Sequence, residues 1–252
     1  MWLDRTLMSL ARLLLCSGSA LLVAAFVYRG ATPKPAEIAA DVREEPRQTA
    51  TRVKPFSVHA DGVDYRIDPV FDYDIAGLVV NRHDTKTWWD TIHADTNDHL
   101  NVADLCLAWG ANAADGAYEH MSFHNAQFTC YFSYPGGTPV TQAHVRAISN
   151  NHLLTDNAAV ARTIRNLRVG DQVRLQGQLA SYSHTAGFAF TRGTSTSRDD
   201  SENGACETIF IDQVDVLRRR PVWPRALGWM GTLLLAAGLV VWYRAPNSSR
   251  AW

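Results

Sequence analysis

One cysteine in a polar, turn-forming segment is a candidate nucleophile. Cys206 lies in the sequence GACE, and His152 and His184 occur elsewhere in the chain as available bases. A reactive thiol needs a cation or a helix N-terminus that lowers its pKa, and a base within hydrogen-bond reach. Arg198 could supply the cation, but the residues after Cys206 have the pattern of a strand rather than of an activating helix. A cysteine hydrolase is therefore an alternative interpretation, not the first one.

Histidines and aspartates also cluster between residues 83 and 99. The metal-ligand candidates are His83, His93, Asp95 and His99. Zinc ligands must converge at about 2.0–2.3 Å, and no H-E-x-x-H or C-x-x-C pair is present to impose that geometry. We expect the tract 88–100 to form a surface loop or short helix, anchored in the core by Trp88 or Trp89. The sequence predicts neither a bound metal nor a cofactor.

The remaining cysteines can form one disulfide. Cys16 lies in an apolar terminal segment, which leaves Cys106, Cys130 and Cys206 for one bridge and one free thiol. Cys106 and Cys130 each lie in an apolar, ordered segment, LCLAW and FTCYF, so we predict that they pair if the domain is periplasmic. Closing a loop of about 24 residues stabilises by roughly 3 kcal/mol in the chain-entropy model. The alternative is that all three are small core residues.

The Ser- and Thr-rich stretch before Cys206 does not match a phosphate-binding loop. Its sequence, GTSTSRDDSENG, lacks the lysine that a Walker motif requires. We interpret it as a solvated loop between strands, in which short polar side chains satisfy the local backbone. Arg198, Asp199 and Glu207 are expected to form an ion-pair network that fixes this loop against the sheet.

Two apolar segments, 13–28 and 226–243, bracket the polar middle of the chain. About 20 apolar residues are needed to cross a bilayer. The exit of the first segment lacks an A-x-A cleavage pattern, which favours an uncleaved anchor over a cleaved signal peptide. The second segment is uncharged and has aromatic residues near its ends, as in a membrane-interface belt. We predict two transmembrane helices.

Charges near these spans give conflicting orientations. Arg218, Arg219, Arg220 and Arg225 precede the second span, which by the positive-inside rule would place the domain in the cytoplasm. Long translocated domains escape that rule, and residues 29–54 have the composition of an extended, solvated envelope linker. We therefore predict a periplasmic domain at a bacterial inner membrane, with a cytoplasmic domain as the alternative.

Composition limits the class of partner, and the segment pattern predicts the domain organisation. The chain has 24 basic and 25 acidic residues, which argues against a nucleic-acid partner, because such a surface needs a basic excess. The expected segments are an N-terminal tail (1–12), a span (13–28), a flexible linker (29–54), a globular domain (55–217), a basic and aromatic membrane-proximal segment (218–225), a span (226–243) and a C-terminal tail (244–252).

Strand patterns dominate the globular domain. The pair Asp61-Gly62 divides two alternating runs and predicts a tight hairpin turn. Residues 71–80 become apolar on both faces around Gly77, as in a buried strand. Further strands are expected at 173–179, 188–190 and 208–216.

Two helices are also expected. One is capped by Thr155 or Asp156 and ends at Gly170, and the other covers 101–109, with a buried strand ADLCLAW as the alternative. The fold class is therefore α+β, with a curved, mainly antiparallel sheet, a few short helices and two flanking transmembrane helices. An OB-like barrel is one form that such a sheet could take.

The chain resembles a family of uncharacterised bacterial membrane or envelope proteins. Its members end in a pattern like S-S-L-T-R-x-D-x-G-x-G-A-C-E before a final strand, and residues 195–199 and 204–207 stand in the matching order. FDYDIAGLVV and ADLCLAWG match earlier blocks, so the similarity covers most of 56–216. The chain departs from the pattern at Thr196 and at Glu202-Asn203. The resemblance implies a shared fold and an envelope setting, and it implies no activity.

The first functional interpretation is a membrane-anchored, non-enzymatic binding or scaffolding domain. Its expected partners are the lipid bilayer and an envelope protein, contacted through the loops 83–98 and 194–207. The alternatives are a hydrolase that uses Cys206, a metal-binding domain, and an accessory subunit of a membrane complex recruited through the two spans.

Overall fold

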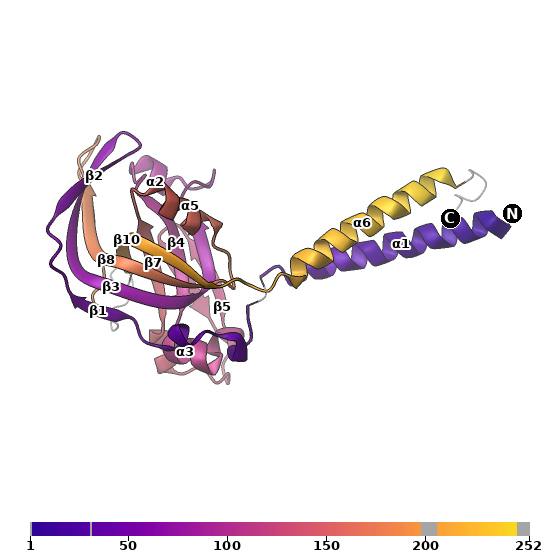
Figure 1. Cartoon of the computed structure of the whole chain (residues 1–252), viewed down its shortest axis with the longest axis horizontal. Helices are drawn as coiled ribbons and strands as arrows, with labels where there is room; N and C mark the ends of the chain where they lie inside the picture. Colours follow the sequence, from indigo (N-terminus) through magenta and orange to yellow (C-terminus); the bar gives the residue numbers. More distant parts are fainter. Residues whose placement is uncertain (1, 31, 198–205, 246–252) are drawn as a thin grey trace. The chain divides into compact units, whose positions relative to one another are not determined.

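The computed structural model describes residues 2–30, 32–197 and 206–245. The chain divides into two compact units, which are a pair of terminal helices and a domain that covers Thr32–Arg220. We describe the two units separately (Figure 1).

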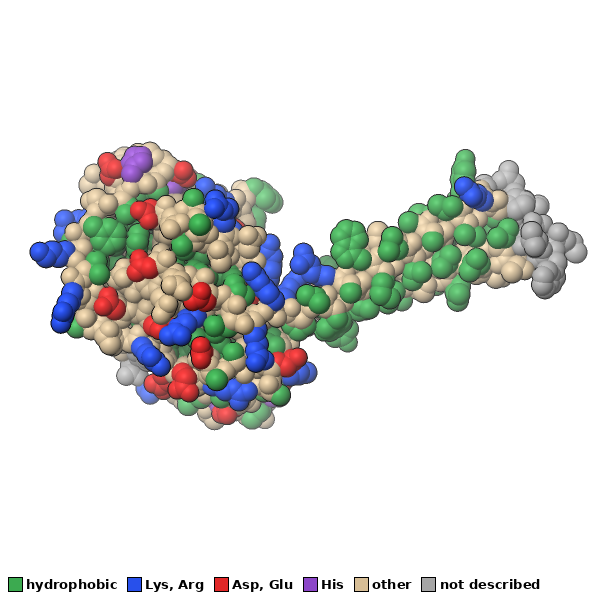
Figure 2. All heavy atoms as spheres, viewed as in Figure 1, with side chains coloured by type: hydrophobic (Ala, Val, Ile, Leu, Met, Phe, Trp, Pro, Cys, Tyr) green, Lys and Arg blue, Asp and Glu red, His purple; other side chains and the backbone are tan. Residues whose placement is uncertain are grey.

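The helix pair consists of α1 (Trp2–Val27) and α6 (Trp223–Arg244). Each contains a 22-residue stretch that is long and apolar enough to cross a membrane, since 22 helical residues extend about 33 Å. Figure 2 shows hydrophobic side chains over the outside of this pair. The first helix begins well before residue 13, where the sequence predicted its span to start.

Small residues let the two helices pack closely in antiparallel fashion. A Cβ added to Gly18 would lie 2.9 Å from the Gly231 carbonyl oxygen, and a Cβ added to Gly231 would lie 2.9 Å from that of Gly18. Gly228 faces Ala25 and Gly238 faces Leu15, so residue numbers rise along one helix as they fall along the other. Membrane helices use small residues in this way to bring backbones together.

The domain is built on an eight-stranded sheet. Its strands are β1 (Arg47–Ala50), β2 (Phe56–Ala60), β3 (Val63–Asp84), β4 (Asn101–Ala108), β7 (Ile148–Leu154), β8 (Gln172–His184), β9 (Phe190–Arg192) and β10 (Cys206–Arg218). A separate hairpin joins β5 (Ser122–Ala126) to β6 (Thr129–Ser133). The helices are α2 (Ile92–Asp95), α3 (Gly110–Asp115), α4 (Gln142–Arg146) and α5 (Ala158–Asn166), with short 3₁₀ turns at Pro35–Glu37, Ala40–Arg43 and Ala117–His120.

The sheet pairings close into a ring. The strand order is β1-β3-β4-β7-β10-β8-β9, and β8 also pairs with β3. Every pairing is antiparallel except that of β7 with β10. The ring is not a barrel, which corrects the OB-like expectation. Its closure depends on one long strand, because β3 pairs with β8 over Arg66–Leu78 and with β4 over Leu78–Asp84, and β1 and β2 extend from β3 as additional strands.

Two sequence predictions for this sheet are confirmed. Asp61 and Gly62 both have positive φ angles, 45° and 85°, and they join β2 to β3 in a tight hairpin. The alternating run from Val173 to Leu179 lies in β8, and its apolar side chains are buried.

The helix predicted over 101–109 is wrong, because this segment is strand β4. It pairs with β3 on one edge and β7 on the other, and all eight of its residues are buried. Leu105 and Leu107 join the main apolar core. The alternate positions, which include Asp104 and Cys106, face the other way. A strand covered on both faces is nearly continuous in apolar residues, so its period does not separate it from a helix.

Two local boundaries also differ from the sequence predictions. Helix α5 is capped by Asn157, whose side chain accepts from the backbone N–H groups of Ala159 and Val160, rather than by Thr155 or Asp156. The linker expected to be solvated is ordered against the domain, with Ile38 and Val42 buried. It ends in strand β1, which pairs with β3.

A disulfide joins the hairpin to the sheet. Cys106 on β4 and Cys130 on β6 are bonded, with their Cα atoms 5.7 Å apart, as the sequence predicted. Because Asp104 and Cys106 are two residues apart on one strand, they share a face. The disulfide therefore holds the β5-β6 hairpin over the face that carries Asp104.

Candidate functional site

Three neighbouring strands place the candidate catalytic side chains on one face of the sheet. Asp104 on β4 pairs with His152 on β7, which in turn pairs with Thr208 on β10. Cys206 lies two residues before Thr208 and pairs with Asn150. Directly paired residues project to the same face of a sheet, so these side chains gather on one face.

Asp104 and His152 form the buried centre of this group. Asp104 Oδ1 lies 2.7 Å from His152 Nδ1, and both side chains are almost fully buried. Because a carboxylate only accepts, Nδ1 carries the proton and Nε2 is left for other partners. Burial would raise the pKa of Asp104, but His152, with help from His93 and Asn101, outweighs it and lowers this pKa to about 2.

Cys206 lies near His152 and lines the same pocket. Its thiol interacts with the His152 side chain and accepts from Asn150 Nδ2 at 3.4 Å. Burial raises the pKa of Cys206, but the contacts with His152 and Asn150 more than offset burial, so that the pKa lies below its ordinary value. The structure thus brings Cys206 together with the base that the sequence could not assign, and Asp104 orients that base.

Two opposing influences act on the charge of His152. Burial lowers its pKa, whereas Asp104 and Cys206 raise it to about 9. Arg192 Nη1 lies 3.1 Å from Nε2 and can only donate, so this contact favours the neutral imidazole. We assign a raised pKa, because Asp104 is closer and fully buried whereas Arg192 is partly exposed. Protonation of Nε2 must then displace Arg192.

An open pocket exposes this centre to ligands. Its volume is about 520 Å³. Cys206, His152, Arg192 and Phe128 line it together with hydroxyl side chains. Cys206 is half-buried, so the sulfur lies at the wall of a space that a small molecule can enter.

Phe128 closes one side of the pocket in a strained conformation. It lies at the tip of the β5-β6 hairpin with φ of 64°, which a bulky residue rarely adopts. Its backbone N–H donates to Asp104 Oδ2 at 3.0 Å, and its carbonyl oxygen accepts from Asn150 Nδ2 at 2.8 Å. Its ring contacts the guanidinium of Arg192. These contacts hold the strained residue in place, as is common at functional sites.

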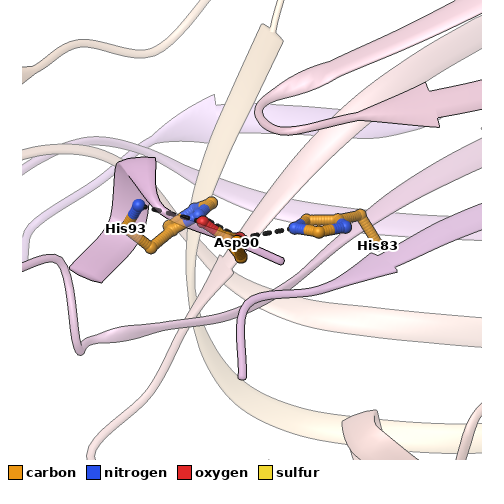
Figure 3. Close-up of side chains that lie close together, drawn as sticks. All are labelled: His83, Asp90 and His93. Atoms are coloured by element: carbon orange, nitrogen blue, oxygen red, sulfur yellow. Dashed lines mark hydrogen bonds and ion pairs between the residues drawn. The ribbon is translucent and has the colours of Figure 1, made fainter. Parts of the chain in front are cut away.

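A second buried cluster contains two of the predicted metal ligands. Asp90 Oδ2 lies 2.5 Å from His83 Nε2 and 2.6 Å from His93 Nδ1, and Figure 3 shows the carboxylate between the two imidazoles. The other candidates, Asp95 and His99, lie outside this cluster.

Hydrogen bonds account for the geometry of this cluster better than a metal does. Neighbouring ligands of a tetrahedral zinc lie about 3.3 Å apart, since each bond is about 2.0 Å long. The two N···O distances to Asp90 are shorter than that. The second nitrogen of His93 lies 3.0 Å from Asn101 Nδ2, and burial lowers the pKa of His93. Both observations fit a neutral imidazole that donates to Asp90 and accepts from Asn101.

Asn101 joins the two clusters into one network. Its Nδ2 donates to His93 Nε2 and, at 2.9 Å, to Asp104 Oδ1. A continuous series of buried polar contacts therefore runs from Asp90 to Cys206. Such networks restrict the orientations of the side chains in them.

The sequence predictions for His184, Trp88 and Trp89 are wrong. His184 bonds to the Thr96 carbonyl oxygen at 2.9 Å and stacks on Phe190, so it is not the base for Cys206. Trp88 is 93% exposed and Trp89 is 44% exposed, so neither anchors its loop in the core. The buried side chains of this tract are those of the polar residues Asp90, His93 and Asp98, and of the apolar Leu100 at its end.

The predicted loop network can be placed only in part. Glu207 is buried at the start of β10. Arg198 and Asp199 lie outside the described residues.

Sequence reasoning missed Asp104, Asp90, Asn101 and Arg192. A signal existed for Asp104, because an aspartate inside the apolar run ADLCLAW needs a buried partner. Comparisons with protein-family models, curated proteins and solved structures gave no match. The site is therefore interpreted from its own geometry.

Replacing Asp104 by asparagine should destabilise the domain in a pH-dependent way. The pKa of Asp104 is lowered to about 2, so its contribution is present above about pH 4 and is lost as the pH falls. The pKa of His152 is raised to about 9, so its contribution is present below about pH 6.5 and is lost as the pH rises. We expect Asp104→Asn to cost about 3–5 kcal/mol near pH 5–6, and less near pH 9.

Thermal unfolding of the detergent-solubilised protein across this pH range measures the effect. The matched control is Asp95→Asn, because Asp95 is exposed. A variant at position 104 that unfolds like the wild type at every pH would contradict the assigned ion pair.

Proposed function

We propose that this protein is a membrane-anchored thiol enzyme in which Cys206 attacks a carbonyl carbon. The observation that carries the proposal is the series of a half-buried thiol, an imidazole and a buried carboxylate at the wall of an open pocket. Nucleophile, base and orienting carboxylate in that order are the requirements of nucleophilic acyl transfer. The substrate class is an ester, thioester or activated amide.

Each residue of the series has a distinct role in this reaction. His152 Nε2 takes the Cys206 proton, the sulfur bonds to the carbonyl carbon, and the leaving group departs with the proton from Nε2. Water, deprotonated by His152, then cleaves the acyl-sulfur bond and restores the thiol. Asp104 holds Nδ1 protonated and stabilises the imidazolium that forms in both steps.

The proposed setting is the periplasmic side of a bacterial inner membrane. Two apolar helices of membrane-spanning length support the anchoring. The Cys106–Cys130 disulfide supports an oxidising compartment. A chain that crosses twice has both termini on one side of the membrane and the segment between its spans on the other. The termini would then be cytoplasmic.

A non-enzymatic binding role is the second candidate. The observation in its favour is the nearly complete exposure of Trp88, beside the exposed Ile92, in one of the loops expected to contact a partner. Large exposed aromatic residues commonly anchor protein interfaces. Binding through this loop would survive loss of the Cys206 thiol, whereas the enzymatic role would not.

An ester that releases a coloured product tests the enzymatic role. With p-nitrophenyl acetate, the full-length protein should release about one equivalent of nitrophenolate in a rapid burst. It should also retain an acetyl group on Cys206, detected by peptide mass spectrometry. His152→Gln should slow acylation by at least about 100-fold, because it removes general base catalysis.

Two further variants make this result specific. Cys206→Ser should show neither burst nor label, whereas Cys16→Ser should behave like the wild type. A burst that persists in Cys206→Ser, or an unlabelled Cys206 in the wild type, would overturn the proposed enzymatic role.

Labelling of cells with a membrane-impermeant maleimide tests the proposed side of the membrane. After the outer membrane is opened, Cys206 should label in intact spheroplasts, because it faces the pocket. Cys106 and Cys130 should label only after reduction and unfolding. The control is Cys16→Ser, which removes the thiol of the first span. Labelling of Cys206 only after lysis would place the domain in the cytoplasm.

A further inference from the structure

The pocket beside Cys206 is lined by an arginine, Arg192, whose charge no carboxylate among the described lining residues balances. Arg192 and His152 contribute the basic groups, and no aspartate or glutamate is among the described lining residues. Both basic groups line the same pocket as Cys206. A neutral pocket for an uncharged acyl group would not need this arrangement.

Within the described part of the domain, Arg192 lacks the carboxylate partner that other arginines of the sheet have. Arg174 on β8 pairs with Asp74 at 2.5 Å, and Arg82 on β3 pairs with Asp84 at 3.2 Å. Within residues 32–197 and 206–220, no carboxylate lies within 4 Å of the Arg192 guanidinium. Its polar contact there is with His152 Nε2 at 3.1 Å.

The buried carboxylates of Asp98 and Asp104 have other partners. Asp98 accepts from the Tyr182 hydroxyl at 2.6 Å, and Asp104 is paired with His152. Arg192 influences Asp98 only at longer range. Part of its donor capacity is therefore available to a ligand, since a guanidinium has five N–H donors in a fixed fork.

A contact with Phe128 holds the Arg192 guanidinium at the wall of the pocket. The central carbon of the guanidinium lies 3.6 Å from the centroid of the Phe128 ring. This cation–π contact holds the guanidinium over the ring, and its N–H groups can still donate to a ligand. Thr129 and Thr191 line the same pocket, and their hydroxyl groups can donate to a bound oxygen.

We propose that this pocket binds an oxyanion, a carboxylate or a phosphate group, through Arg192 and the hydroxyls of Thr129 and Thr191. If Cys206 is the acyl-transfer nucleophile proposed above, its substrates are acyl compounds that carry such a group near the reacting carbonyl. An oxyanion that binds Nη1 also draws Arg192 from His152 Nε2. Nε2 can then carry the proton of the imidazolium without facing an N–H donor of Arg192.

Two alkylating reagents of equal size test the inference on the full-length protein. Iodoacetate carries a carboxylate and iodoacetamide does not, and both transfer their carbon to the Cys206 sulfur with loss of iodide. The rate ratio of iodoacetate to iodoacetamide should be at least about fivefold higher in the wild type than in Arg192→Gln, as expected for loss of one charge pair. The matched control is Arg162→Gln, on the exposed face of α5, which should keep the wild-type ratio.

The outcomes separate this inference from the proposed enzyme. A reactive Cys206 whose rate ratio is unchanged by Arg192→Gln would overturn the oxyanion site and leave the acyl-transfer role standing. A Cys206 that reacts with neither reagent would overturn the acyl-transfer role. The oxyanion site is then tested by thermal unfolding in inorganic phosphate at constant ionic strength. A midpoint that rises saturably in the wild type and not in Arg192→Gln supports the site, and equal midpoints overturn it.

Discussion

The buried carboxylate of Asp104 is the constraint on which the rest of the domain depends. A charge inside a protein is tolerated only when donors surround it. Its donors come from three elements, namely His152 on β7, Asn101 at the start of β4, and the backbone N–H of Phe128 at the hairpin tip. Moving β7 or the hairpin tip away would remove one of the donors of this buried carboxylate. The disulfide at Cys106, two residues along β4, holds the hairpin in that position.

The polar network around Asp104 also explains how the pocket-lining thiol of Cys206 has a base, His152, with a fixed orientation. Asp90 accepts from His83 and His93, and Asn101 connects His93 to Asp104. The His152 ring is therefore oriented by groups that are themselves buried and bonded. At the far end of the network, Cys206 and Arg192 line the pocket together with the His152 ring. A preorganised nucleophile needs a base that is held by buried contacts and a sulfur that a substrate can reach, and the network provides both.

Parts of this arrangement could be predicted from the sequence, where the signal is local. The Asp61-Gly62 turn follows from backbone sterics, and the alternation in β8 follows from one buried face. The pairing of Cys106 with Cys130 followed from two apolar contexts. By contrast, β4 is buried on both faces and has no diagnostic period. Its aspartate acquires a partner 48 residues later only because β4 and β7 lie side by side. Arg192 carries no local signal at all, since its role depends on the pocket that the hairpin and β10 create.

The thiolate absorbance of Cys206 tests the central claim most directly. Absorbance at 240 nm is measured against pH for the full-length protein, and the Cys206→Ser signal is subtracted to remove Cys16. The account predicts a Cys206 titration midpoint clearly below the ordinary thiol value of about 8.5. In His152→Gln, where the largest contact that opposes burial is lost, the midpoint should rise. A wild-type midpoint at or above about 8.5, unchanged by His152→Gln, would contradict the assignment of Cys206 as an activated nucleophile.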